Sequence, residues 1–317
     1  MRALVTGAAG FVGANLVRRL LADGHEVHAL VRAGTDRWRL DEVGGEIQWG
    51  EVDLRDGEAV AAAVAAARAE VVFHLGTRGA YSWQADAREI LETNVLGTSN
   101  VVEACAQAGV RALVNTGSSS EYGHKDHAPA ENEALEPNSV YGVAKVAATL
   151  LCSVAASLHD LAVTTLRLYS VYGPYEEPGR FVPALVEAAL GERLPLLASP
   201  NVARDFVWVG DVVDAYLRAA SAPGAGAVYN VGSGRQTTLA EAVKVAQRVL
   251  GVTEQPSWSS MPDRSWDTEL WVADVSKIER ELGWRPAVDF EEGLARTAAW
   301  VRGDAATRER YAERAIR

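Results

Sequence analysis

The sequence has little of what marks several common classes of protein. It holds only two cysteines, Cys105 and Cys152, and their spacing matches no metal site. No stretch approaches the roughly 20 apolar residues of a membrane span, and the short apolar run 3–5 is not the core of a secretory signal. We therefore expect a cytoplasmic protein with two inert thiols, no metal and no membrane partner.

The sequence also lacks clustered positive charge. Its 31 Lys and Arg residues are outnumbered by 42 Asp and Glu residues, and the net charge of −11 is spread along the chain. We expect no nucleic-acid partner, because such a surface needs a stripe of basic residues. Any anionic ligand must be met by a few local cations. The 48% of hydrophobic residues in a chain of 317 are enough for one large or two medium cores.

Short β-rich runs alternate with helical patterns along the first half of the chain. Strands are predicted at residues 3–5, 26–30, 71–75, 112–116 and 163–168, and helices at 14–22, 59–69, 90–108 and 141–157. This alternation predicts an α/β protein with a Rossmann-like doubly wound parallel sheet. Glycine and proline become denser from Tyr172 onward, which predicts a smaller C-terminal α/β domain. We place the domains at 1–170 and 171–317, with the chain returning to the first around 205–232.

Three evenly spaced glycines follow the first predicted strand and lead into a helix. Backbone N–H groups at such a helix N-terminus can face a pyrophosphate, and glycine leaves room for its approach. A glycine turn without a ligand is the alternative. Two later features favour a dinucleotide, because an acidic residue after the run 47–52 can reach an adenine and a small residue ends the strand 71–75. The predicted cofactor-binding residues are Gly7, Gly10, Phe11, Val12, Gly13, Asp53, Leu54, Leu75 and Gly76.

Candidate catalytic residues lie between residues 115 and 145. Ser118 falls at the C-terminal edge of a predicted strand, where open α/β sheets bind ligands. Tyr141 and Lys145 are four residues apart and share one helical face. An ammonium beside the phenol lowers the Tyr141 pKa from ~10, so that Tyr141 can exchange a proton with a carbinol oxygen that Ser118 orients. Asn94, also counted as cofactor-binding, is either an anchor for Lys145 through water or a buried amide.

Further motifs occur in a fixed order at residues 167–174 (RLYSVYGP), 203–207 (ARDFV), 229–233 (YNVGS) and 282–286 (LGWRP). The whole set resembles the extended short-chain dehydrogenase/reductase family, in its nucleotide-sugar epimerase and dehydratase branch. The resemblance covers nearly the whole chain. It implies a domain that binds NAD or NADP, a nucleoside-diphosphate sugar as partner, and catalytic roles for Ser118, Tyr141 and Lys145. It also implies that Tyr141 and Lys145 bind the cofactor, with Lys145 reaching the nicotinamide ribose. It also implies a homodimer formed by helices 90–108 and 143–157, whose apolar surfaces are broader than one sheet face needs.

The resemblance further implies which residues hold the nucleotide sugar. Arg204 is similar to the family arginine that clamps the diphosphate. Arg264 and Asp267 occupy the place of the family's Arg-Pro-Gly-Asp, whose arginine meets phosphate and whose Asp meets ribose. The loop after strand 71–75 and the edge near Ser118 are expected to face the hexose. The predicted substrate-binding residues are Tyr81, Ser119, Ser120, Glu121, Ser170, Arg204, Arg264 and Asp267.

Two departures from the family pattern bear on the reaction. Sugar-nucleotide 4,6-dehydratases carry Thr-Asp-Glu where this chain has three serines from Ser118 to Ser120, so the pair that eliminates water is missing. Dehydratase activity is therefore a weaker hypothesis, although Glu121 lies one position later and can supply a carboxylate. Ser170 stands where an Asn is frequent, which changes the expected grip on the diphosphate or sugar.

The second predicted strand bears on the cofactor. NAD-preferring members place an acidic residue near its end, but this chain has Val31 there, followed by Arg32 and Arg37. Because arginines attract a 2′-phosphate, we predict NADP in preference to NAD. NADP favours an NADPH-dependent reductase of a nucleotide-linked 4-keto-6-deoxy sugar as the main hypothesis. The alternative is a nucleoside-diphosphate-sugar 4-epimerase with a tightly bound cofactor, and a cofactor-sensing protein without turnover is a third interpretation.

Overall fold

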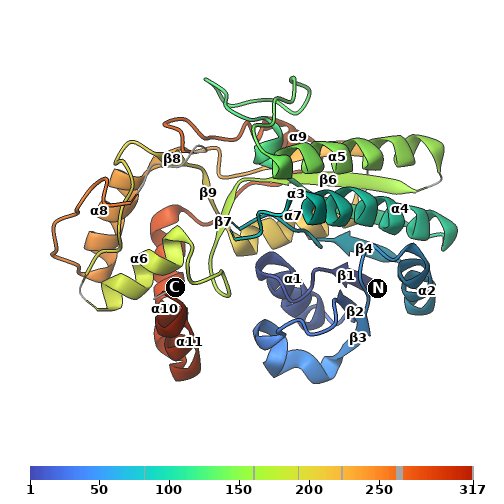
Figure 1. Cartoon of the computed structure of the whole chain (residues 1–317), viewed down its shortest axis with the longest axis horizontal. Helices are drawn as coiled ribbons and strands as arrows, with labels where there is room; N and C mark the ends of the chain where they lie inside the picture. Colours follow the sequence, from blue (N-terminus) through green and yellow to red (C-terminus); the bar gives the residue numbers. More distant parts are fainter. Residues whose placement is uncertain (82, 160, 192, 223, 262–266, 316–317) are drawn as a thin grey trace.

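A seven-stranded parallel sheet forms the centre of the molecule (Figure 1). The computed structural model describes the chain except residues 82, 160, 192, 223, 262–266 and 316–317. The order β10-β6-β5-β4-β1-β2-β3 changes direction between β1 and β4, which confirms the predicted Rossmann-like doubly wound sheet. Its strands are β1 (Arg2–Thr6), β2 (Glu26–Val31), β3 (Ile47–Glu51), β4 (Val71–His74), β5 (Ala112–Ser118), β6 (Ala162–Leu168) and β10 (Ala225–Val231).

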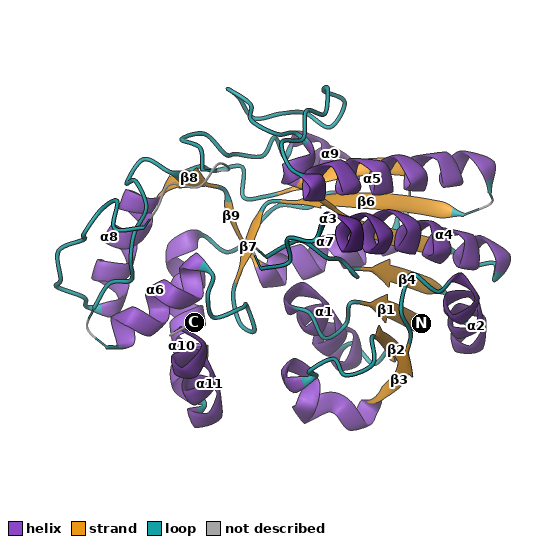
Figure 2. Cartoon of the chain, in the orientation of Figure 1, coloured by secondary structure: helices purple, strands orange, loops and turns teal. Residues whose placement is uncertain are grey.

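Helices cover both faces of this sheet (Figure 2). The side chains of β1 alternate between the two faces. Ala3 and Val5 enter one core with Leu16 of α1, whereas Leu4 enters the other core with Val101 of α4. Strands buried on both faces appear in the sequence as continuous apolar runs. One face carries α1 (Phe11–Ala22), α7 (Val209–Ser221) and α9 (Ser276–Leu282), and the other carries α2 (Gly57–Ala67), α4 (Gly97–Gln107) and α5 (Val140–Leu158).

A smaller lobe lies beside the sheet, on the left in Figure 1. The chain enters this lobe after β6, returns to the sheet with α7 and β10, and leaves it again. Tyr172, Leu185, Phe206, Val243 and Leu294 are central to its separate core. The lobe contains α6 (Phe181–Leu190), α8 (Leu239–Leu250), α10 (Phe290–Gly303), α11 (Ala305–Ala315), and the strand pairs β7 (Ser170–Tyr172) with β9 (Phe206–Trp208) and β8 (Ala203–Arg204) with β11 (Thr237–Thr238).

The predicted helix 90–108 is divided into three segments. It consists of α3 (Ala87–Leu91), the π-helical turn η2 (Glu92–Leu96) and α4. Such widened turns are frequent at functional sites, and this one contains the buried Asn94. The 3-10 segments η1 (Trp38–Glu46) and η3 (Ser119–Glu121) are likewise not predicted by the sequence pattern. Cys105 and Cys152 are buried in α4 and α5.

Candidate active site

The glycine-rich turn between β1 and α1 packs against the end of β4. Gly7 has a φ of +67°, and a Cβ there would lie 2.7 Å from the Gly76 nitrogen, so only glycine fits. A Cβ on Gly13 would overlap the carbonyl oxygen of Gly7. Within the described residues, α1 begins after Gly10 with no side-chain cap and no acidic residue in its first turn, which holds Phe11, Val12 and Gly13. Its N-terminal N–H groups therefore fit an anionic ligand such as a pyrophosphate.

The residues predicted to contact adenine lie next to this turn. Leu54 packs on Gly76, where a Cβ would lie 2.5 Å from Leu54 Cδ1. Leu75 is 8% exposed at the end of β4. Arg55 donates to both carboxylate oxygens of Asp53 and lowers the pKa of that carboxyl. Asp53 therefore stays ionised beside the site.

The two arginines predicted to bind a 2′-phosphate differ in their surroundings. Arg32 is exposed at the end of β2. Arg37 pairs with Glu51 at 2.5 Å, and its guanidinium lies 4.5 Å from the centre of the Trp49 ring. A phosphate at Arg37 would have to compete with a carboxylate already bound there.

The structure brings Ser118, Tyr141 and Lys145 together where β5 ends beside α5. The Tyr141 hydroxyl is hydrogen-bonded to the Ser118 side chain. The Lys145 ammonium donates to the carbonyl oxygen of Thr116 at 2.9 Å and lies 5.8 Å from the centre of the Tyr141 ring. The four-residue spacing on α5 is what places the phenol and the ammonium on one side of the helix. Tyr141 can carry a proton, Lys145 supplies a cation and Ser118 supplies an orienting hydroxyl. We call these three residues the catalytic constellation.

Burial governs the charge states of this pair. Lys145 is 4% exposed, and burial lowers its pKa to about 8. Burial raises the pKa of Tyr141 to about 12, although the hydrogen bond to Ser118 acts in the opposite direction. The expected fall of the Tyr141 pKa below 10 is therefore wrong, because desolvation of the phenolate outweighs the interactions that favour it.

Thr77, in the loop after β4, and Asn94 of η2 support Tyr141. The Thr77 side chain is hydrogen-bonded to Tyr141 and donates to Asn94 Oδ1 at 3.2 Å. Asn94 also accepts from the Arg78 N–H and donates to the Arg78 carbonyl oxygen, each at 2.8 Å. Asn94 is therefore a buried amide with partners for both its oxygen and its nitrogen, and it reaches Tyr141 through Thr77. Nothing in the sequence marks Thr77 except its place directly after the glycine that ends β4.

Glu121 does not face a substrate, which corrects its assignment as a substrate-binding residue. It is 0% exposed. One carboxylate oxygen accepts the Ser118 N–H at 2.8 Å, and the other accepts the Thr149 hydroxyl at 3.0 Å and Arg167 Nε at 2.8 Å. The cause is local, because Ser118 caps the short segment η3 and Glu121 folds back to complete a capping box.

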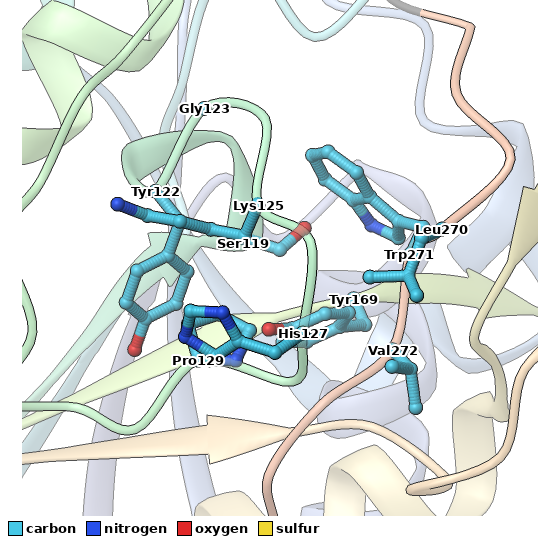
Figure 3. A pocket seen from close by; sticks show the side chains of 10 residues that line it. All are labelled: Ser119, Tyr122, Gly123, Lys125, His127, Pro129, Tyr169, Leu270, Trp271 and Val272. Atoms are coloured by element: carbon cyan, nitrogen blue, oxygen red, sulfur yellow. The ribbon is translucent and has the colours of Figure 1, made fainter.

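Ser119 and Ser120 stand next to Ser118 at the edge of the sheet. The Ser120 N–H donates to Ser118 Oγ at 3.1 Å. Ser119 lines a pocket together with Tyr169 and Trp271 (Figure 3). The rings of Tyr169 and Trp271 meet edge to face with centres 6.3 Å apart. The Tyr169 hydroxyl is buried and has no hydrogen-bond partner among the described residues. An unused polar group therefore lies close to the catalytic constellation.

The remaining residues predicted to hold the nucleotide sugar lie in the smaller lobe and in the loop after β4. Arg204 of β8 donates to Asp267 at 2.6 Å, so the predicted diphosphate and ribose contacts lie side by side. Arg264 lies outside the described residues. Tyr81 stacks on a neighbouring tryptophan with ring centres 4.6 Å apart. Ser170 begins β7 and is partly buried.

Known proteins share this architecture along the whole chain. A profile of the NAD dependent epimerase/dehydratase family matches residues 3–232. The chain is 34% identical over 312 residues to the UDP-glucose 4-epimerase of Mycolicibacterium smegmatis, covering 95% of this chain and 99% of that protein. It is 32% identical over 320 residues to a dTDP-glucose 4,6-dehydratase of Streptomyces griseus, with coverages of 94% and 93%. The crystal structure of Thermus thermophilus UDP-glucose 4-epimerase in complex with NAD has a TM-score of 0.86 and 32% identity, covering 96% of this chain and 100% of that chain.

Proposed function

Because this chain belongs to the NAD dependent epimerase/dehydratase family, we propose that it is a nucleoside-diphosphate-sugar 4-epimerase that works with a bound NAD. The observation that carries the proposal is the Tyr141 hydroxyl, which is hydrogen-bonded to Ser118 and Thr77, with the Lys145 ammonium beside its ring. This hydroxyl can move a proton to and from a sugar oxygen. The similarity to a UDP-glucose 4-epimerase along 95% of the chain supports carbon 4 as the reacting position.

The residues of the chain handle the proton and the orientation of the sugar. The glycine-rich turn and the N-terminus of α1 would hold the pyrophosphate of NAD, and the bound NAD would supply the acceptor and then the donor of hydride for carbon 4. Tyr141 removes the proton of the carbon-4 hydroxyl and later returns it to the same oxygen. The Ser118 hydroxyl orients that oxygen, and the Lys145 ammonium stabilises the phenolate while Tyr141 is ionised. The ketone formed at carbon 4 turns in the site before the hydride returns to its other face, so the configuration at carbon 4 is inverted without net oxidation.

The residues around Ser118 argue against a dehydratase. Elimination of water between carbons 5 and 6 needs an acid and a base, but the chain offers the hydroxyls of Ser119 and Ser120 at those positions. Glu121 is fully buried with both oxygens in use. We therefore infer that the chemistry is confined to carbon 4.

The cofactor separates the epimerase from the 4-keto-6-deoxy-sugar reductase, which needs NADPH. The sequence argument for NADP depended on Arg32 and Arg37. Arg37 is engaged by Glu51, so the exposed Arg32 is left as the cation for a 2′-phosphate. The Thermus epimerase holds NAD, and on these grounds we infer NAD rather than NADP for this chain.

Turnover without added cofactor tests this assignment. The purified protein incubated with UDP-glucose alone should form UDP-galactose, and mass spectrometry of the cofactor released on denaturation should identify NAD. Tyr141→Phe is the matched control, because it removes the proton carrier and leaves the packing unchanged. Conversion of a 4-keto-6-deoxy nucleotide sugar only when NADPH is added would replace the epimerase with the reductase.

We also propose a homodimer through the exposed side of η2, α4 and α5. Leu96, Leu150 and Val154 are each more than half exposed on this side. α5 is long and apolar enough to cross a membrane, with a mean hydropathy of 1.6, but its other side packs on the sheet and carries the buried Lys145. A second copy would cover the apolar face in a four-helix interface. Light scattering should give twice 33.9 kDa, and Leu150→Glu should lower it toward 33.9 kDa. A wild-type mass of 33.9 kDa would contradict the dimer.

A further inference from the structure

The Glu121 carboxylate joins three elements around the catalytic constellation. It holds the end of β5 through the Ser118 N–H, α5 through the Thr149 hydroxyl, and β6 through Arg167 Nε. Thr149 lies one helical turn beyond Lys145, on the same side of α5. A shift of this carboxylate would therefore move Ser118 relative to the helix that carries the phenol and the ammonium.

The space around the carboxylate is full. A Cβ on Gly117 would lie 2.7 Å from Glu121 Oε1, so the strand admits the carboxylate only because glycine precedes Ser118. Arg167 is itself fixed, because its Nη1 donates to the Tyr122 hydroxyl at 2.8 Å and its guanidinium lies 4.7 Å from the Tyr122 ring centre. A displacement of the Glu121 carboxylate would therefore break its contact with Arg167.

The Glu121 carboxylate, which pairs with Arg167 at 2.8 Å, is the acidic neighbour of Lys145 among the described groups that act on that ammonium. Burial raises the pKa of the Glu121 carboxyl, but Arg167 opposes the rise, and the contacts to its oxygens come from donors. Cys152 and His74 also face Lys145. Burial raises the Cys152 pKa to about 12 and lowers the His74 pKa to about 3, so both are uncharged near neutral pH. The Glu121 charge therefore raises the pKa of Lys145 against the effect of burial.

The same charge acts on Tyr141. Ser118 and Thr77 lower the Tyr141 pKa through hydrogen bonds and Arg180 lowers it through its charge, whereas Glu121 raises it. Removal of the Glu121 charge should lower the pKa of both Tyr141 and Lys145. Both limbs of a pH profile that depends on this pair should then move in one direction, toward lower pH.

We propose that Glu121 is a positioning residue for the proposed epimerase reaction, on which this inference rests: its carboxylate fixes Ser118 against α5, the helix that carries Tyr141 and Lys145. Glu121 touches neither substrate nor cofactor in this role. It acts through the serine that orients the sugar oxygen and through the ammonium that stabilises the phenolate.

Two substitutions separate the reach of the carboxylate from its charge. Glu121→Gln keeps the length and the acceptor oxygen but loses the charge. Glu121→Asp keeps the charge and the pairing with Arg167 but is one methylene too short to hold both Ser118 and Thr149. Glu176→Gln is the matched control, because Glu176 is a buried glutamate of the smaller lobe with 5% exposure. All variants are measured as holoenzymes with UDP-glucose over a range of pH, after their melting temperatures show that they are folded.

The expected results differ for the two variants. The pH profile of kcat should move to lower pH in Glu121→Gln. In Glu121→Asp it should keep the wild-type position while kcat falls by about 10- to 100-fold at similar KM. A Glu121→Asp enzyme with wild-type kcat, together with a Glu121→Gln profile at the wild-type pH, would overturn the proposal.

A second readout does not depend on the substrate. The ionisation of Tyr141 is followed in the holoenzyme by the ultraviolet absorbance of tyrosinate, with Tyr141→Phe subtracted. It should begin at lower pH in Glu121→Gln than in the wild type and Glu121→Asp, and coincident curves would overturn the charge effect. Failure of the wild type to convert any nucleotide sugar would instead reject the proposed function, and this titration would still decide the role of Glu121.

Discussion

Glu121 and Glu176 are both buried glutamates, but the fold treats them differently. Glu121 gives its oxygens to three donors at the centre of the sheet domain. Glu176 lies in the turn between β7 and α6, and its partner Arg180 is 3.7 Å away with a side chain that is 49% exposed. The second Glu176 oxygen is buried and has no partner among the described residues.

This difference decides the charge of each group. Burial raises the pKa of Glu176 to about 8, so this carboxyl holds its proton near neutral pH. Arg167 pairs with Glu121 at 2.8 Å and opposes the rise in the pKa of that carboxyl that burial causes. A buried carboxylate stays charged only where the fold supplies donors to it. Glu121 has such donors to both oxygens, and it lies beside Tyr141 and Lys145, where a charge influences a proton transfer. Glu176, at the turn that joins the two lobes, lacks a donor to one of its oxygens among the described residues.

The largest effect is expected at the constellation that Glu121 supports. Tyr141→Phe removes the proton carrier, so turnover should fall by about 10²-fold or more at an unchanged melting temperature and NAD content. Lys145→Met should lower turnover and also weaken NAD binding, because the family resemblance implies that this lysine reaches the nicotinamide ribose. A Tyr141→Phe enzyme that keeps more than about a tenth of the activity would exclude Tyr141 as the proton carrier.

The two arginine partners should differ in their effect on stability. Arg167→Met leaves Glu121 charged and unpaired in the interior and should lower the free energy of unfolding by about 3–5 kcal/mol. Arg180→Met removes a half-exposed partner at 3.7 Å and should lower it by about 0–1 kcal/mol. Urea unfolding at one pH measures both. Equal losses would mean that the two glutamates are held alike.

Sequence alone identifies the constellation but not its support. Ser118, Tyr141 and Lys145 are marked because each combines a reactive group with a recognisable place, at a strand end or at a four-residue helical spacing. The capping box with Ser118 sets the direction of Glu121 locally, but Arg167, which pairs with its carboxylate, is 46 residues away in the chain and 2.8 Å away in space. The contact between Glu121 and Arg167 cannot be predicted from residue type or local spacing.

The same limit applies to the fold and to the charge states. Alternating strands and helices predict the doubly wound sheet because the crossover rule leaves few topologies. The π turn that carries Asn94 is not predicted, since an extra residue within a helix hardly changes its apolar pattern. The direction of the Tyr141 pKa shift is wrong for a related reason, because the burial of the phenol is a consequence of tertiary packing.

The proton on Glu176 should appear as a pH dependence of stability. Its folded pKa of about 8 exceeds the ordinary value of 4.5, so the folded state binds more protons than the unfolded state between these values. Glu176 makes its full contribution to the free energy of unfolding below pH 4.5, and this contribution is lost as the pH rises to about 8. The free energy of unfolding should fall by no more than about 1.4 kcal/mol per pH unit in this range.

Glu176→Gln should remove this part of the slope. His74, whose pKa is lowered by burial from 6.5 to about 3, changes stability only below pH 6.5, so urea unfolding from pH 6.5 to 8 isolates Glu176 from it. Parallel stability curves for the wild type and Glu176→Gln would show that Glu176 is ionised in the folded protein, and the contrast with Glu121 would be lost.

The smallest expected effect separates a lost hydrogen bond from a lost function. Thr149→Val removes the hydroxyl that donates to the Glu121 carboxylate at 3.0 Å, and Tyr311→Phe removes the hydroxyl that donates to the Glu176 carbonyl oxygen at 2.5 Å. Both hydroxyls belong to buried residues, so each substitution should lower the free energy of unfolding by about 1 kcal/mol. Only Thr149→Val should also lower kcat, because it alone loosens the hold of Glu121 on α5 beside Lys145. An equal fall of kcat in both variants would assign the effect to a general loosening of the fold, and Glu121 would then differ from Glu176 in charge alone.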